Sequence, residues 1–226
     1  MTKPVALFAL AWALFVLAVS APAALAAALP ETLARRPWLD HAVTKTVLVA
    51  LAFALMAASR RPLADHGFRR ASDPRWLRSA MRGGLLGAVT TAALILAPTE
   101  GMTWIRDLGV GGIVLWIWLH STVTEEVFVR GWFQSAIPGP RATLWSAALF
   151  GSMHLLILRQ GADWITVGII VPATTLLGLL CAQDRERSGS LGPPIITHCA
   201  FNVGGFLAGV AITIAVAVAT GKPPAP

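Results

Sequence analysis

The feature of this sequence that most constrains its fold is a series of long apolar runs separated by short polar segments. An α-helix needs about 20 apolar residues to cross the hydrocarbon core of a bilayer, which is roughly 30 Å thick. The runs lie at about 4–29, 42–58, 84–97, 109–130, 143–158, 165–181 and 195–218. Because a chain in lipid has to satisfy its backbone hydrogen bonds internally, each run predicts a helix. The predicted fold is an all-α polytopic transmembrane bundle of about seven helices, with about six to eight as the range.

The composition excludes an ordinary soluble domain. Only 13% of the residues are charged and 56% are hydrophobic, whereas soluble domains carry about 25% charged residues. No internal repeat or soluble segment is apparent, so residues 1–226 are predicted to form a single integral membrane domain. The net charge of +7 does not indicate nucleic-acid binding, because the arginines lie between apolar runs. There they are placed to contact anionic headgroups of the lipid bilayer.

Three segments allow alternative interpretations. The first run follows Lys3 and ends in alanines, which is also typical of a signal peptide; we favour a first transmembrane helix because the run is long enough to span. Residues after Asp73-Pro74 form either a short helix in the membrane interface or the lead-in to the third span. Gly204-Gly205 in the last run allows either close helix packing or a bend.

The arginines also predict an orientation. The segment from Arg60 to Arg82 holds seven arginines against two aspartates. Loops rich in arginine and lysine favour the cytoplasmic side of a membrane. The N-terminus is therefore predicted to be cytoplasmic and, with an odd number of spans, the C-terminus to lie outside.

Ionisable and amide side chains lie inside three of the apolar runs. Each charged side chain costs about 2.5–3.5 kcal/mol at the centre of a membrane helix, so it is by default a candidate for function. The candidates are Glu125, Glu126, Arg130, His154, His198 and Asn202. Because lipid offers such groups no partners, we expect their helices to turn them toward one another.

Taken singly, each of these groups also has a purely structural interpretation. Glu126 and Arg130 are four residues apart with the acid first, which favours an ion pair along one helix. Glu125 is rotated about 100° from Glu126 on an α-helix and has no visible local partner. The functional interpretation is therefore stronger for Glu125 than for Glu126.

The histidines are equally ambiguous when each is considered alone. Phe150 precedes His154 by one turn and can pack against its imidazole. His198 and Asn202 are four residues apart and therefore project from one face of one helix. The functional signal lies in the combination of three helices that each carry polar groups at membrane depth.

Three ordered motifs resemble those of the CPBP intramembrane proteases: Glu125-Glu126-xxx-Arg130, Phe150-xxx-His154 and His198-xxx-Asn202. That family includes the CAAX prenyl endopeptidases of the Rce1 type and many bacterial proteins of the Abi group. The resemblance covers residues 84–206, which would be the catalytic core. It implies a cavity open toward the cytoplasm, a membrane-associated protein or peptide as substrate, and a location in a bacterial cell membrane.

The resemblance also implies a role for each motif residue. Glu125 would activate the attacking water with the help of His154. His198 and Asn202 would stabilise the oxyanion. Three further residues would support the geometry of the site: Glu126, Arg130 and Phe150.

The residue types are sufficient for peptide hydrolysis with or without a metal ion. A carboxylate and an imidazole can move the proton of a water, and donors one helical turn apart can stabilise an oxyanion. One glutamate and two histidines also match the ligands of some catalytic zinc sites. Zinc would be held by Glu125, His154 and His198, with Glu126 as the base. The HExxH zinc motif is absent, and we favour the metal-free hypothesis.

Two other classes of function compete with the peptidase hypothesis. Buried carboxylates and histidines also form the relays of proton-coupled transporters, although the repeated halves of many transporters are not apparent here. A non-catalytic membrane partner or immunity protein would use the same polar groups only to hold its helices together. We favour the peptidase, because the three motifs occur together and in order.

Overall fold

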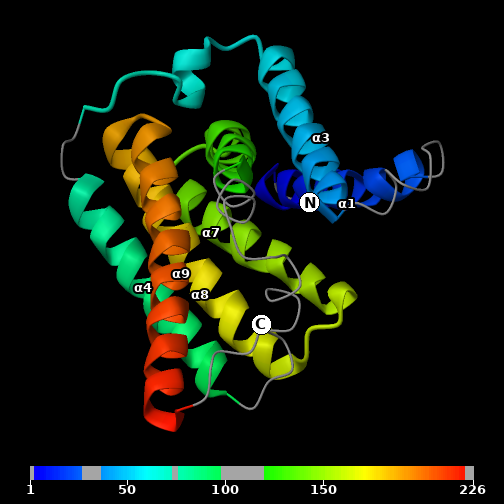
Figure 1. Ribbon diagram of the computed structural model, residues 1–226. Helices are drawn as coiled ribbons and strands as arrows, with labels where there is room; N and C mark the ends of the chain where they lie inside the picture. The colour runs from blue at the N-terminus through cyan, green and yellow to red at the C-terminus, as the bar shows by residue number, and fades with distance from the viewer. Residues whose placement is uncertain (1–2, 27–36, 73–75, 98–119, 222–226) are drawn as a thin grey trace.

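The computed structural model describes residues 3–26, 37–72, 76–97 and 120–221. Its longer helices are α1 (Lys3–Ala26), α3 (Pro37–Ala58), α4 (Trp76–Leu96), α7 (Arg141–Met153), α8 (Trp164–Ser188) and α9 (Gly192–Thr220). The shorter elements are η1 (Leu63–His66), the π-helix η2 (Val127–Gln134) and η3 (His154–Gln160). Every regular element within the described residues is helical (Figure 1), which confirms the all-α prediction.

Six helical stretches of the described chain are long and apolar enough to cross a membrane. They correspond to six of the seven predicted runs. The remaining run, 109–130, is described only from residue 120 onward. A seventh span in this region therefore stays a prediction, because most of the run lies outside the described residues.

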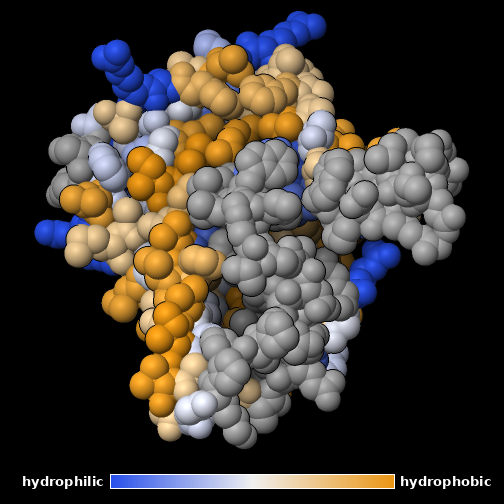
Figure 2. Space-filling view, viewed as in Figure 1, coloured by the Kyte–Doolittle hydropathy of each residue, from blue (hydrophilic) through white to orange (hydrophobic). Residues whose placement is uncertain are grey.

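The surface of the bundle fits a lipid environment. Along α9, large apolar side chains such as Leu207 and Val218 are 59% and 79% exposed. Figure 2 shows hydrophobic side chains over α9 and several strongly hydrophilic ones at the end where loop 59–72 lies. Exposed apolar surface of this extent is costly in water. In a bilayer the same side chains face hydrocarbon.

Helices α4 and α9 run side by side (Figure 1), and glycines bring their backbones into close contact. A Cβ atom on Gly87 would lie 1.9 Å from the carbonyl oxygen of Phe201. One on Gly204 would lie 2.1 Å from the carbonyl oxygen of Gly84. Small residues at such crossings allow the dispersion contacts that hold membrane helices together. Of the two interpretations of Gly204-Gly205, close packing is confirmed, because α9 continues through both residues.

Helix α4 begins at Trp76 and includes the segment that also suggested a separate interface helix. The lead-in interpretation is therefore confirmed: the apolar run begins near residue 84, and the helix that contains it begins earlier, at Trp76. The extra turns are stabilised by tertiary packing, since Ser79, Ala80 and Gly83 are buried. This extension places Arg78 and Arg82 of α4 beside the end of α8.

Helices α1 and α3 pack on the remainder of the bundle and contribute to its core. Ala11 and Ala18 of α1 and Leu48 of α3 are fully buried. The indole Nε1 of Trp12 donates a hydrogen bond to Ser152 Oγ at 3.0 Å, which ties α1 to α7. This packing holds α3 in place, and α3 carries one residue of the site described below.

Loop 59–72 folds across one end of the bundle. The buried imidazole of His66 donates from Nδ1 to the carbonyl oxygen of Gly131, 2.9 Å away in the π-helix. Arg69 Nε donates to the carbonyl oxygen of Gly189 at 2.8 Å, in the turn between α8 and α9. Gly189 has φ +67°, a left-handed conformation that glycine adopts without strain. The loop thus fixes η2 relative to the start of α9.

Candidate active site

The two adjacent glutamates lie at the junction of two kinds of helix. Residues 120–126 are α-helical, and the wider π-helix η2 begins at Val127. π-Helical turns are rare and occur frequently at functional sites. Glu125 is 9% exposed and Glu126 is fully buried. Both carboxylates are therefore largely removed from bulk water.

Glu126 forms the ion pair with Arg130 that the sequence spacing favours. Arg130 Nη1 donates to Glu126 Oε1 at 3.0 Å, and both side chains are 0% exposed. The guanidinium group also donates from Nη2 to the carbonyl oxygen of Gly178 on α8 at 2.9 Å. Its carbon Cζ lies 4.6 Å from the centre of the Phe150 ring, a cation–π contact. Arg130 thereby joins η2, α7 and α8 around one carboxylate.

His198 lies between the two glutamates. Its Nδ1 donates a hydrogen bond to Glu126 Oε1 at 2.9 Å. Its Nε2 lies 4.0 Å from Glu125 Oε2, too far for a direct hydrogen bond. The ring stacks edge-on against Phe150, with centroids 5.2 Å apart. One face of α9 therefore presents a fixed imidazole to Glu125.

His154 follows the last residue of α7 and begins η3. Its Nδ1 donates to the carbonyl oxygen of Phe150 at 2.9 Å, which leaves Nε2 to accept a proton. The imidazole lies edge-on to the same Phe150 ring, 5.1 Å away. Phe150 thus separates and orients the two histidines.

Lys45 of α3 is a residue of the site that the sequence interpretation missed. Its ammonium group forms an ion pair with Glu125 Oε1, and the two side chains are 10% and 12% exposed. Ser121 Oγ donates to the same oxygen at 3.0 Å. The position of Lys45 inside the run 42–58 could have identified it as a candidate. A charged lysine within a membrane helix is costly in free energy, as the glutamates are. Its partner, 80 residues away in the chain, could not be inferred from spacing.

Asn202 lies one turn after His198 but has a different hydrogen-bond partner. Its Nδ2 donates to Thr122 Oγ1 at 3.0 Å. Among the described residues, Phe150 contacts both His154 and His198, and His198 faces Glu125. Glu126 and Arg130 support this group through the hydrogen bond to His198 and the ion pair between them. Asn202 adjoins this group from the same helix face without a described contact to Glu125. That these side chains line one water-accessible hollow stays a prediction.

The predicted zinc alternative would use Glu125, His154 and His198 as its ligands. Among the described residues, no three histidine, cysteine, aspartate or glutamate side chains converge as ligands for one ion. The cation beside Glu125 is the ammonium group of Lys45. His198 uses Nδ1 to bind Glu126. The zinc alternative, with Glu125, His154 and His198 as ligands, stays a prediction.

Comparison with family models identifies the segment that holds this site. Residues 108–204 match the model of the type II CAAX prenyl endopeptidase Rce1-like family. The matched range contains all three motifs and falls within the predicted core 84–206. Comparisons with curated proteins and with solved structures gave no match. Residues 108–204 are therefore similar to the Rce1-like family, in agreement with the resemblance that the motifs indicated.

Proposed function

We propose that the protein is an intramembrane endopeptidase that hydrolyses peptide bonds of membrane-associated proteins or peptides. The observation that carries the proposal is the 4.0 Å separation between Glu125 Oε2 and His198 Nε2. A carboxylate and an imidazole that face each other at this distance can share a water molecule. A water about 2.8 Å from each atom would fit between them.

Glu125 is the proposed base. Its Oε1 is held by Lys45 and Ser121, so Oε2 is the oxygen available to the water. The Lys45 ammonium group balances the negative charge of Glu125. The side chain can therefore remain an ionised carboxylate, which is the form that accepts a proton from water. His154, with Nε2 unprotonated, would relay that proton to the departing amine. Proton transfer by positioned groups of this kind accelerates reactions by about a hundredfold to ten-thousandfold.

His198 and Asn202 are the proposed oxyanion donors. Because His198 already donates from Nδ1 to Glu126, it must carry a second proton on Nε2 to donate to an oxyanion. The Glu126 carboxylate would stabilise that doubly protonated ring. The Asn202 amide has two hydrogens, and its bond to Thr122 uses one of them. The other remains available for the substrate.

The proposed orientation places the N-terminus in the cytoplasm and opens the site toward that side. Arg61 and Arg69 of loop 59–72 bind carbonyl oxygens of Ser135 and Gly189. Arg185 in turn binds the carbonyl oxygen of Asp65. These arginines therefore gather at one end of the bundle, as the positive-inside rule expects of a cytoplasmic end.

The test is cleavage of a panel of membrane-anchored peptides by the purified protein in liposomes. We expect cleavage by the wild type and a large loss in Glu125→Gln. A transporter would instead move protons without cleaving any peptide. A non-catalytic partner protein would retain its biological activity in Glu125→Gln, so that outcome would refute the peptidase proposal.

A further inference from the structure

A polar cavity lies where the start of α4 meets the end of α8 and the start of α9. Its volume is about 370 Å³, within the range of about 300–1,000 Å³ typical of small-ligand sites. None of the residues assigned to the peptidase site lines it. We propose that this cavity binds the phosphate-bearing headgroup of an anionic membrane lipid.

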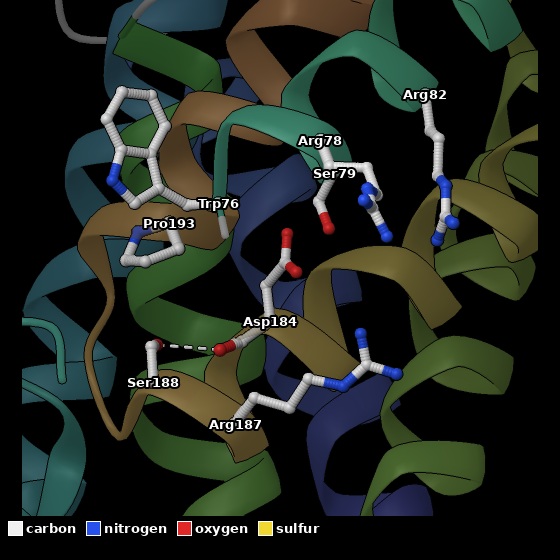
Figure 3. A pocket seen from close by; sticks show the side chains of 8 residues that line it. All are labelled: Trp76, Arg78, Ser79, Arg82, Asp184, Arg187, Ser188 and Pro193. Atoms are coloured by element: carbon white, nitrogen blue, oxygen red, sulfur yellow. Dashed lines mark hydrogen bonds between the residues drawn. The ribbon is translucent and has the colours of Figure 1, made fainter. Parts of the chain in front are cut away.

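Three arginines supply the recognition chemistry. Arg78 and Arg82 are one turn apart on α4, and Arg187 lies near the end of α8. Figure 3 shows their guanidinium groups on one side of the cavity, away from Trp76 and Pro193. Within the described part of the chain, none of the three forms a hydrogen bond or a close ion pair, although Arg187 interacts electrostatically with Asp184. Like charges one helical turn apart destabilise a helix, and a bound anion would remove that repulsion.

The floor of the cavity is formed by Asp184, whose contacts are already made. It is 5% exposed, and its Oδ2 accepts a hydrogen bond from Thr197 Oγ1 at 2.7 Å. Ser188 Oγ donates to the backbone carbonyl of Asp184 at 2.6 Å, the bond drawn in Figure 3. The lining therefore carries three arginines against one aspartate, an excess of two positive charges. Planar guanidinium groups bind phosphate oxygens in pairs, which makes phosphate the best-matched anion.

The surroundings favour a lipid over a soluble phosphate. Trp76 lies at the edge of the cavity and is 36% exposed, and indole rings concentrate at the level of lipid headgroups. From there an apolar stripe of α4 at four-residue spacing continues along the bundle, formed by Leu77, Met81 and Leu85, which are 58%, 70% and 68% exposed. An acyl chain can lie along this stripe while its phosphate occupies the cavity. Basic pockets between transmembrane helices are known lipid-headgroup sites.

Native mass spectrometry of the full-length protein from mixed nanodiscs tests the proposal. The wild type should retain phosphatidylglycerol in preference to phosphatidylcholine. The triple variant Arg78→Gln/Arg82→Gln/Arg187→Gln should bind phosphatidylglycerol about a hundredfold more weakly, since each arginine contributes about fivefold. The matched control is Arg60→Gln/Arg70→Gln/Arg141→Gln, which removes the same charge from exposed positions outside the cavity. It should retain the wild-type preference.

Three results would overturn the proposal. The first is a wild type without preference for the anionic lipid, which needs no variant and so does not depend on how the variants fold. The second is that inorganic phosphate, in the absence of lipid, binds as tightly as phosphatidylglycerol does. That result would make the site one for a soluble anion. The third is a triple variant that keeps its lipid preference but has a raised KM for peptides. That result would assign the arginines to a peptide carboxylate.

Discussion

Lys45 of α3 and Glu125 form an ion pair between helices that are 80 residues apart in the chain. Both side chains are largely buried, at 10% and 12% exposure. A second pair, Glu126 with Arg130, lies beside it and is fully buried. Two carboxylates are thus balanced by two cations at membrane depth. This pairing of charges allows two adjacent glutamates to be buried in an apolar bundle. Breaking either ion pair should have its own measurable effect.

Lys45→Met is expected to destabilise the protein, because it leaves the Glu125 carboxylate buried without its cation. Removing one partner of a buried pair costs about 3–5 kcal/mol, and the residual exposure of this pair places it at the lower end. Thermal unfolding in detergent measures the effect. The double variant Lys45→Met/Glu125→Gln should recover most of the loss, since no charge then remains unpaired. If the single and double variants are equally unstable, the pair does not stabilise the fold.

Glu126→Gln should reduce turnover more than it weakens substrate binding. A glutamine cannot stabilise the doubly protonated His198 as a carboxylate does, although it can still accept the hydrogen bond now made at 2.9 Å. We expect kcat to fall at least about tenfold, by loss of one charge-assisted hydrogen bond, with KM nearly unchanged. Steady-state kinetics on a membrane-anchored peptide give both values. A rise in KM at constant kcat would place Glu126 in substrate binding instead.

Gly87→Ala should separate α4 from α9. The added Cβ would meet the carbonyl oxygen of Phe201 at 1.9 Å, which is backbone and cannot turn aside. Gly84→Ala is the matched control on the same helix, because its Cβ would find its nearest neighbour at an ordinary 3.5 Å. We expect a stability loss of about 1–3 kcal/mol for Gly87→Ala, as for overpacked cores, and little change for Gly84→Ala. Equal melting temperatures for the two variants would contradict the described crossing.

Peptide cleavage is expected to survive treatment with a metal chelator. The proposed reaction uses Glu125 and His154 to move protons, and the described side chains do not converge as metal ligands. Activity should therefore be unchanged after chelation, and metal analysis of the purified protein should find less than one equivalent of zinc. Loss of activity on chelation with recovery on zinc addition would establish the alternative ligand set, Glu125, His154 and His198.

Local spacing was sufficient to predict much of this architecture. The apolar runs predict helices because lipid requires backbone hydrogen bonds to close within each segment. The Glu126–Arg130 pair and the contact of Phe150 with His154 are also local, since each joins residues four apart. The cost of unpartnered polar groups in lipid added the expectation that the three polar segments meet.

Contacts between distant segments could not be predicted in the same way. Nothing in the spacing pairs Lys45 with Glu125 or Asn202 with Thr122, each 80 residues apart. The early start of α4 depends on burial against neighbouring helices rather than on apolar periodicity. The change from α- to π-helix after Glu126 is likewise invisible in the sequence pattern. These features are set by tertiary packing, which one sequence does not reveal.

The most direct test of the account is the cleavage rate of Glu125→Gln in liposomes, measured beside Glu186→Gln. Both variants exchange one carboxylate for an amide, but Glu186 is exposed and binds Thr143 outside the cluster. We predict that Glu125→Gln loses at least about a hundredfold in kcat/KM, as expected for a general base, while Glu186→Gln retains wild-type activity. Equal cleavage by wild type and Glu125→Gln, with both proteins folded, would contradict the assignment of Glu125 as the residue that activates water.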